Sequence, residues 1–271
     1  MKVILSRKGF DSTNGKRPSV VMPDGAVVSF PIPSPDESML FSGLQYKGIP
    51  YSRILADLGC ECANGTCHLD PDLDVSRHIK PPEMWIPGFG QVGTSLSYLL
   101  NTVRVEPGDL FLFFGWFRFV EKVDGKFRYV RRDNDYFCSH DMHLIWGYLQ
   151  VGEILSSYDE KKSRLRWHPH AQMRRASDPL DDIFVARKAL SFAPSMPGAG
   201  ILPYSRRRVL TREGANRACW KFDKVYAPDH VIGNRKNSAR GDGVYYSGIW
   251  QELGLKDDKS TEDWAKQMVL V

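Results

Sequence analysis

The stretch PGDLFLFFGWFRFVEKVDGKFRYVRRDNDYFCSHDMHLIWGYLQVGEI, residues 107–154, decides the fold of this chain. Residues 110–114 are a continuous apolar run that is too short for a typical helix, which indicates a strand covered on both faces. Residues 126–130 alternate between charged and apolar after an Asp-Gly hairpin signal, so one face of this strand is expected to meet water. Residues 143–154 are apolar again. The stretch therefore predicts three strands, antiparallel in a small barrel or a strongly curved sheet.

The order of these elements is typical of small PUA-like barrels, which accept a base or a nucleotide in an aromatic cleft. A Gly-Asp turn, a buried strand, a basic hairpin and a strand ending in Val-Gly-Glu at residues 151–153 follow one another. Any antiparallel meander can produce the same order. We predict an α+β fold in which a mixed or antiparallel curved sheet has a PUA-like barrel core near residues 105–192, with peripheral helices.

The rest of the chain predicts short elements joined by many loops. The expected strands lie at residues 2–6, 27–32 and 183–186, and the expected helices at 51–58 and 94–100. A final helix is expected near residues 261–271, capped by Ser260 or Thr261 and carrying an apolar stripe. No internal repeat or low-complexity segment is visible, so residues 1–271 are expected to form a single domain.

The composition is that of an ordinary globular protein. With 271 residues, of which 42% are hydrophobic, the chain can bury a sizeable core. No run of about 18 apolar residues and no export signal is visible, so no membrane partner and a cytoplasmic location are expected. The five Cys are then expected to be reduced thiols. The net charge of +5 permits an anionic partner without requiring one.

Cys, His and Asp residues gather between residues 60 and 72. The Cys and His spacing over residues 60–68 fits no C-x₂-C zinc knuckle, so no metal site is assigned. Asp70 and Asp72 follow in a loop stiffened by a proline. Two carboxylates at this spacing can divide into a general acid and a base, or hold a divalent ion against a phosphate. The alternative is a turn in which Asp70 caps neighbouring amides.

Three histidines and two cations are further candidates for a site. His143 begins an apolar strand, where a lone His is more often a hydrogen-bonded core residue than a catalyst. His168 and His170 alternate in an extended loop, so their side chains can converge on one ligand or one phosphate. Arg7 and Lys8 leave the first strand next to a glycine, as in a phosphate-binding loop, although no known phosphate-loop motif is present.

Basic residues interleave with aromatic ones at residues 116–119, 127–132 and 220–222. A nucleic-acid groove has this composition, since bases stack on aromatic faces while cations hold the backbone, but an amphipathic strand has it too. Three consecutive arginines at 206–208 and the loop at 233–241 concentrate positive charge in the last quarter of the chain. That loop is expected to be long and flexible, and to contact phosphate or cover an anionic substrate.

Six segments along the chain form a recognisable set: KVILSRKGFDS at 2–12, DPDL at 70–73, FGQ at 89–91, GDLFLFFGWFR at 108–118, HLIWGYLQVGEI at 143–154 and HPH at 168–170. Together they resemble the nucleotide-modification-associated domain family, third class. This bacterial and phage family is linked to DNA base modification. The resemblance therefore implies a part in that process but does not specify which reaction the protein catalyses. The positions that carry the family motifs here are Arg7, Lys8, Asp11, His68, Asp70, Asp72, Gln91, Arg118, His143, His168 and His170. The last quarter is only weakly similar, and the basic loop at 233–243 is expected to depart from the family.

Two classes of function remain open. In the first, the protein is an enzyme of nucleotide or DNA base modification that works by acid–base or metal-assisted group transfer. Its catalytic candidates are Asp11, Asp70, Asp72, His143, His168 and His170, and its substrate-binding candidates are Arg7, Lys8, Gln91, Trp116, Arg118 and Trp146. In the second, it is a non-catalytic PUA-like reader that receives a modified base among Trp116, Phe117 and Trp146.

Both classes imply a nucleotide or a nucleic acid as partner, with DNA favoured, and neither identifies a cofactor. The enzyme reading makes a geometric prediction, because chemistry needs its groups within a few ångströms of one ligand. Side chains far apart in the sequence are expected to line one cleft, namely Arg7, Asp11, Asp70, His143 and His168.

Overall fold

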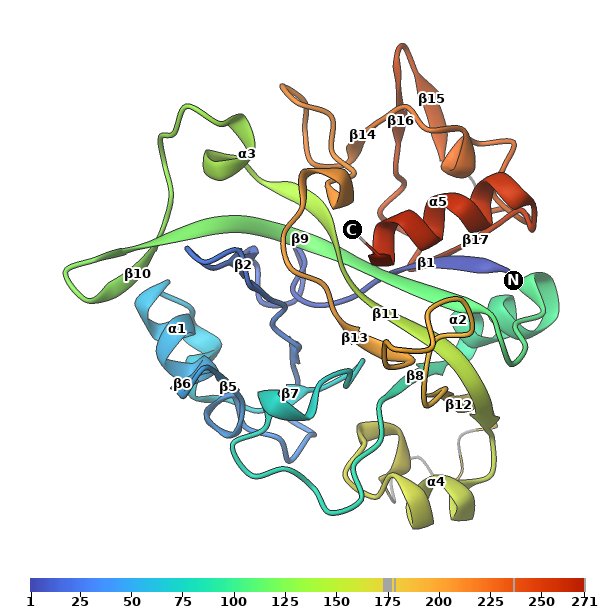
Figure 1. Cartoon of the computed structure of the whole chain (residues 1–271). Coiled ribbons are helices and arrows are strands. Elements are labelled where there is room, and N and C mark those ends of the chain that lie inside the picture. The colour runs from blue at the N-terminus through green and yellow to red at the C-terminus, as the bar shows by residue number, and fades with distance from the viewer. Residues whose placement is uncertain (173–176, 178, 236, 271) are drawn as a thin grey trace.

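The computed structural model describes residues 1–172, 177, 179–235 and 237–270 (Figure 1). Two 14-residue strands, β9 (Leu110–Val123) and β11 (Met142–Leu155), run antiparallel across its centre. β10 (Lys126–Tyr129) returns along the far end of β9. The turn between them has left-handed φ angles at Asp124 and Gly125, 49° and 74°, as an Asp-Gly hairpin turn requires. The prediction of antiparallel strands over residues 105–155 is confirmed.

These strands belong to a ten-stranded mixed sheet with the central order β17-β1-β9-β11-β12-β8. β1 and β2 pair parallel with β9, and the other pairings are antiparallel. The sheet curls into a half-barrel, and it takes strands from well outside residues 105–192. Its further strands are β1 (Val3–Arg7), β2 (Ser19–Val21), β3 (Val27–Val28), β8 (Gly88–Val92), β12 (Asp181–Ala186), β13 (Ala199–Ile201) and β17 (Glu252–Leu255).

Both faces of the sheet are covered, as the apolar run in β9 predicted. Successive side chains of a strand point to opposite faces. Phe111 and Phe113 pack on one face against Phe89 of β8. Phe114 lies on the other face, where it contacts Trp220 edge to face. All of these rings are fully buried, so β9 stands between two hydrophobic cores.

Short elements surround the sheet. The helices are α1 (Tyr51–Asp57), α2 (Gly93–Ser97), α3 (Tyr136–Ser139), α4 (Tyr158–Arg164) and α5 (Lys259–Leu270), with single turns η1 (Phe41–Gly43), η2 (Glu61–Asn64), η3 (Val75–Arg77), η4 (Tyr98–Val103), η5 (Pro169–Ala171), η7 (Arg206–Arg208) and η8 (Lys224–Tyr226). The small strands are β4 (Ile32–Pro33), β5 (Gln45–Tyr46), β6 (Ile49–Pro50), β7 (Cys67–His68), β14 (Cys219–Lys221), β15 (Ser238–Arg240) and β16 (Gly243–Tyr245). In the part of the chain that the structure describes, no helix is long and apolar enough to cross a bilayer.

The predicted helices are present with shifted ends. α1 ends before Gly59, whose φ of 71° allows the left-handed stop that the sequence indicated. The helix expected at 94–100 begins as α2 and continues through η4 to Val103. The last helix is capped by Asp258 rather than by Ser260 or Thr261, because the Asp258 carboxylate accepts the backbone N–H of Thr261 at 2.9 Å.

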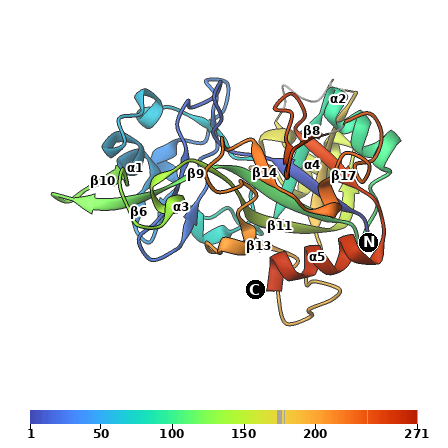
Figure 2. The same ribbon diagram turned by 90° about the horizontal axis from the view of Figure 1, so that it is seen from above.

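One edge of the sheet brings the two ends of the described chain together. β17 pairs antiparallel with β1 from Val3 opposite Leu255 to Ser6 opposite Glu252. The N-terminal ammonium lies 3.4 Å from Asp257, just before α5. Figure 2 shows α5 along one side of the sheet, close to the N-terminus. Residues separated by most of the sequence are therefore neighbours at this edge.

The cysteines differ from the expectation that all five are thiols. Cys60 and Cys62 form a disulfide, because the tight turn at η2 brings their Cα atoms to 5.3 Å, within the range that a disulfide spans. Cys67 is a buried free thiol whose pKa burial raises to about 12. A cysteine-based metal site over residues 60–68 is therefore not formed.

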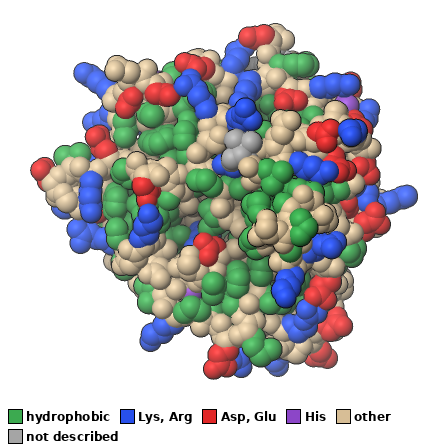
Figure 3. Space-filling view, in the orientation of Figure 1, with side chains coloured by type: hydrophobic (Ala, Val, Ile, Leu, Met, Phe, Trp, Pro, Cys, Tyr) green, Lys and Arg blue, Asp and Glu red, His purple; other side chains and the backbone are tan. Residues whose placement is uncertain are grey.

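The basic segments of the last quarter are more ordered than expected. The loop predicted at 233–241 contains β15, which pairs with β16, and Arg235 within it is buried. Arg208 of η7 is also buried and donates to the backbone carbonyls of Met268 and Pro203. Figure 3 shows Lys and Arg side chains spread over the visible face rather than gathered in one patch.

Candidate functional site

A polar pocket of about 190 Å³ is lined by residues from β1, β7, β8 and the loops beside them, and we call it the central pocket. Six residues singled out in the sequence line it, together with His68 and Gly90: Arg7, Lys8, Asp11, Asp70, Gln91 and His170. Of the five side chains expected in one cleft, Arg7, Asp11 and Asp70 line this pocket, His168 contacts Asp70 from behind, and His143 lies elsewhere.

Asp70 is the buried acid of the central pocket. Its Oδ1 accepts the backbone N–H of Gly90 at 2.6 Å and lies 3.4 Å from Nε2 of His168. Its Oδ2 lies 3.9 Å from Nε2 of His170. Burial alone would raise the pKa of Asp70, but the His168 imidazole 3.4 Å away, together with His170 and the Lys8 ammonium, outweighs burial and holds the pKa below the ordinary range. Asp70 is therefore a carboxylate at neutral pH.

His170 is oriented by a second carboxylate. Its Nδ1 lies 2.6 Å from Oδ1 of Asp181, whose backbone carbonyl accepts a hydrogen bond from Lys161. A carboxylate can only accept, so Nδ1 of neutral His170 carries the proton and Nε2 presents its lone pair toward Asp70. Burial lowers the pKa of His170 to about 4, although both carboxylates oppose that shift. His170 is thus a neutral imidazole whose Nε2 can accept a ligand.

His68 repeats this arrangement across the pocket. Its Nδ1 lies 2.7 Å from Oε1 of Glu37, so Nε2 is the nitrogen left to bind a ligand. The His68 and His170 rings meet edge to face with their centroids 5.2 Å apart. One ligand atom from each of His68, Asp70 and His170 lies within 4.8 Å of the other two. Two imidazoles and one carboxylate therefore face a common point.

His168 and His170 converge, as their alternation in the sequence predicted, and the group they share is Asp70. His168 accepts the backbone N–H of His170 at Nδ1, which leaves the proton on Nε2 facing Asp70. Their ring centroids are 5.5 Å apart. His168 itself is fully buried, so it orients Asp70 from behind the pocket wall.

The opposite wall of the central pocket is cationic. Among the described residues, no carboxylate forms an ion pair with Arg7, whose guanidinium lies 5.8 Å from the ring centre of Tyr246. Lys8 lies 3.5 Å from the buried Glu252, which also pairs with Arg235 at 3.5 Å. Arg7 is therefore the cation best placed to receive an anionic ligand.

Gln91 and Asp11 have structural partners. Gln91 donates to Glu252 from its side-chain amide and accepts the N–H of Val92. Asp11 accepts the backbone N–H groups of Thr13 and Asn14 at 2.7 and 2.6 Å, so it holds its own loop in a turn at the mouth of the pocket. Both side chains shape the wall.

Gly90 allows the pocket to close around His170. A β-carbon at this position would overlap the His170 imidazole, so only glycine lets the ring lie flat against β8. The same residue donates its N–H to Asp70. One glycine therefore sets the position of both side chains.

Asp72 and His143 lie outside the central pocket. Asp72 does not share the direction of Asp70, although strand-like alternation would place both side chains on one side. Its Oδ2 lies 2.8 Å from Nε2 of His78 and accepts a hydrogen bond from Nε1 of Trp85 at 2.8 Å. His143 is buried behind the sheet, where it accepts a hydrogen bond from Trp220 at 3.0 Å. Burial, helped by nearby arginines, lowers the pKa of His143 to about 3.

The aromatic candidates do not form a base-binding cleft. Trp146 is 1% exposed and belongs to the core, as does Phe117. Trp116 is partly exposed, but the guanidinium of Arg217 covers its ring at 4.1 Å. A base cannot stack among these three rings as they are packed.

Arg118 lies in a second hollow, which we call the arginine groove. The groove has a volume of about 780 Å³ and is lined by Tyr129, two carboxylates and five arginines, Arg17, Arg118, Arg128, Arg131 and Arg132. A shallower hollow of about 540 Å³, lined by Gly15, Lys16 and Arg17, lies beside it. Because Asn14 lines the central pocket and Arg17 lines the groove, one short loop connects the two.

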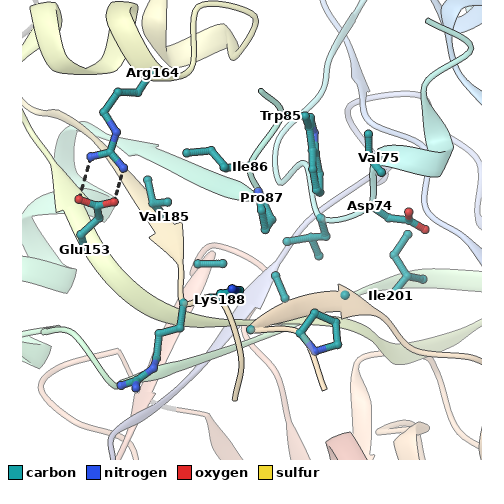
Figure 4. Close-up of a pocket in the computed structure, with 17 residues that line it drawn as sticks. Asp74, Val75, Trp85, Ile86, Pro87, Glu153, Arg164, Val185, Lys188 and Ile201 are labelled. Atoms are coloured by element: carbon teal, nitrogen blue, oxygen red, sulfur yellow. Dashed lines mark hydrogen bonds and ion pairs between the residues drawn. The ribbon is translucent and has the colours of Figure 1, made fainter. Parts of the chain in front are cut away.

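A fourth hollow is mostly apolar. It has a volume of about 640 Å³, and Trp85, Ile86 and Pro87 form one wall (Figure 4). Its charged rim is the ion pair of Glu153 with Arg164, which Figure 4 draws at one edge. Among the described residues, no cluster of His and carboxylate ligands faces this hollow, so we do not assign it a catalytic or metal-binding role.

The fold and the pocket define an α+β protein whose curled sheet collects histidines, carboxylates and cations in one small polar site. The chain belongs to the family described as nucleotide modification associated domain 3, whose sequence model matches residues 2–262. The match confirms the resemblance seen in the sequence and extends through the last quarter, where only weak similarity was expected. No curated protein and no solved structure matches the chain.

The sequence missed three parts of the site. His68 was a family position and was weighed with the cysteines as a metal donor, but it received no catalytic or substrate-binding role. His68-x-Asp70 nevertheless has the alternation that places both side chains on one side of an extended segment. Glu37 and Asp181 were not considered, and nothing in their local sequence signals that each orients a histidine.

Proposed function

We propose that the protein modifies a nucleotide or a DNA base, acting on a phosphate-bearing nucleobase substrate in the central pocket. The observation that carries this proposal is the meeting of Arg7 with the His68, Asp70 and His170 cluster in one small pocket, where no described carboxylate neutralises the guanidinium. The family's association with nucleotide modification supports the substrate class.

In this proposal Arg7 and Lys8 hold a substrate phosphate, because a guanidinium and an ammonium are strong donors to phosphate oxygens. Asp70 and His170 lie opposite and carry out acid–base or metal-assisted group transfer. Asp11, Gln91 and His168 position these groups. Cations and acid–base groups lie together in a pocket of about 190 Å³. We therefore expect the substrate to carry a small reacting group next to its phosphate.

We further propose that the substrate is part of a nucleic acid, with DNA favoured. A groove with five arginines suits a sugar–phosphate backbone, since each phosphate contact releases condensed counterions. The loop at residues 14–17 connects this groove to the central pocket, so a strand held by the arginines would lead toward the reacting groups.

The second candidate is a non-catalytic PUA-like reader of modified bases, within a single domain of residues 1–271. The curled sheet and its basic hairpin favour a relationship to PUA-like barrels. Strands from both ends of the chain pair in one sheet, which favours a single domain. The buried Trp146 and the covered Trp116 argue against the reader cleft. We therefore prefer the enzyme.

Mass spectrometry of nucleosides tests the choice. DNA from cells that produce the protein is compared with DNA from cells that lack it and from cells with the Asp70→Asn variant. An enzyme changes a nucleoside mass, and the variant abolishes that change. Tight binding of DNA by the purified protein, with identical nucleosides in all three samples, would favour the reader.

A further inference from the structure

We propose that His68, Asp70 and His170 bind one divalent transition-metal ion in the central pocket. With a metal ion bound here, the proposed reaction would proceed by metal-assisted group transfer rather than by acid–base transfer alone. Its role in catalysis rests on that function, whereas the binding of the ion does not.

The donor atoms are already close to a coordination geometry. One ligand atom from each of the three residues lies within 4.8 Å of the others. Donors about 2.0 to 2.2 Å from a metal ion lie roughly 3 to 3.5 Å apart, so the widest donor pair needs to close by at most about 1.3 to 1.8 Å. Small rotamer changes at a pocket wall are sufficient for this.

Each imidazole is held in the tautomer that a metal requires. Glu37 lies 2.7 Å from Nδ1 of His68, and Asp181 lies 2.6 Å from Nδ1 of His170. Metal-binding histidines are commonly oriented in this way by a carboxylate on the nitrogen that does not bind. The His68–Glu37 and His170–Asp181 pairs both face Asp70. Packing alone does not explain this arrangement, because each pair places an additional carboxylate beside the pocket.

Asp70 supplies the third ligand from a fixed position. The backbone N–H of Gly90 holds Oδ1 at 2.6 Å, while Oδ2 lies 3.9 Å from Nε2 of His170. Oδ2 is therefore the oxygen that faces His170. Lys161 donates a hydrogen bond to the backbone carbonyl of Asp181, so the residue whose carboxylate orients His170 is also held in place.

The donor set indicates the class of ion. Two imidazole nitrogens and one carboxylate oxygen suit Zn²⁺, Mn²⁺, Fe²⁺ or Co²⁺ better than Mg²⁺ or Ca²⁺, which prefer oxygen ligands throughout. The nearby sulfurs do not compete, because Cys60 and Cys62 are joined in a disulfide and Cys67 is buried. Three protein ligands leave open positions toward Arg7, where a substrate phosphate or a water can bind.

The test is metal binding by the whole purified protein, stripped with a chelator and then titrated with Zn²⁺, Mn²⁺, Co²⁺ and Mg²⁺ in a calorimeter. We expect one equivalent of a transition metal, weak or absent Mg²⁺ binding, and visible d–d absorption for the Co²⁺ form. His68→Gln, Asp70→Asn and His170→Gln are expected to lower the affinity at least 100-fold. The supporting variant Asp181→Asn is expected to lower it about 10- to 100-fold.

The matched control is His230→Gln, because His230 also contacts a carboxylate, Asp258 at 2.7 Å, but does not line the pocket. It is expected to bind metal like the wild type. Failure of the wild-type protein to bind any of these transition metals would overturn the proposal, whether or not the variants fold. Wild-type affinity in all three ligand variants would overturn it as well. Stoichiometric metal binding that depends on the three ligands, with no change in any nucleoside, would support the site and reject the proposed function.

Discussion

Gly90 and His170 are packed so closely that a β-carbon on Gly90 would overlap the imidazole ring. We expect Gly90→Ala to displace His170 from the central pocket and to cost about 1–3 kcal/mol of stability, the usual range for overpacking. Urea denaturation measures the stability, and metal titration measures the site. Gly43→Ala is the control, because its β-carbon would meet only the flexible Met39 side chain, at 3.3 Å. Equal metal binding by the two variants would show that the contact with His170 has no role in the site.

Arg7 is expected to recognise phosphate. Arg7→Ala should weaken the binding of a nucleoside monophosphate about tenfold or more, since a hydrogen bond to a charged group contributes about 1.5–3 kcal/mol. Binding of the corresponding nucleoside should not change. Calorimetry with both ligands measures the difference, and Arg166→Ala serves as the control because Arg166 is an exposed partner of Glu83. An equal decrease in affinity for nucleoside and nucleotide would contradict the assignment.

The arginine groove is expected to set the salt dependence of nucleic-acid binding. Arg131→Ala and Arg132→Ala should each reduce the slope of log affinity against log salt by roughly 0.7–0.9 for each phosphate that the arginine neutralises in the wild type. Filter binding or fluorescence anisotropy at several salt concentrations measures this slope.

Arg206→Ala should leave that slope unchanged, because Arg206 already pairs with Asp135 and Glu213 at 2.9 and 2.8 Å. Because the sequence concentrates positive charge at residues 206–208, this variant also tests whether that charge contacts phosphate. A slope that changes for Arg206 but not for Arg131 would locate the backbone contacts at η7 instead.

His143 is expected to make the protein sensitive to acid. Its pKa is about 3 in the folded protein against about 6.5 when unfolded, so the unfolded state binds the extra proton between these values. Stability should therefore fall with pH below about 6.5, by up to about 1.4 kcal/mol for each pH unit from this group.

His143→Asn should flatten the dependence, since Asn keeps an acceptor near Trp220 but does not titrate. Urea unfolding at several pH values measures the slopes. His140→Asn changes an exposed histidine and is the control. If the His143→Asn protein became less stable in acid as steeply as the wild type, the buried imidazole would not be the cause.

The central strands were predictable because burial on both faces leaves an uninterrupted apolar run in β9, and because few residues other than Gly or Asp tolerate the left-handed turn at Asp124 and Gly125. The length and the order of the sheet were less predictable. β17 joins β1 across nearly the whole sequence, and no local pattern specifies such a pairing.

The site was predictable only in part, for the same reason. Arg7, Asp70 and His170 stand out because their side chains are polar beside apolar strands. The sequence predicted a catalytic role for Asp72 because it is a carboxylate like Asp70. In the structure its side chain points to His78 and Trp85 instead, a direction that the sequence does not indicate. Glu252, Asp181 and Glu37 came into view only when the fold placed them beside Lys8, His170 and His68.

The pairing of β17 with β1 determines when the pocket can be completed during protein synthesis. Lys8 emerges from the ribosome more than 240 residues before its partner Glu252. Until then the cationic wall has no buried carboxylate to hold it, and β1 has an open edge. The nascent chain therefore carries an unfinished site until β17 has emerged, and the proposed nucleotide binding should begin only after that strand has been released.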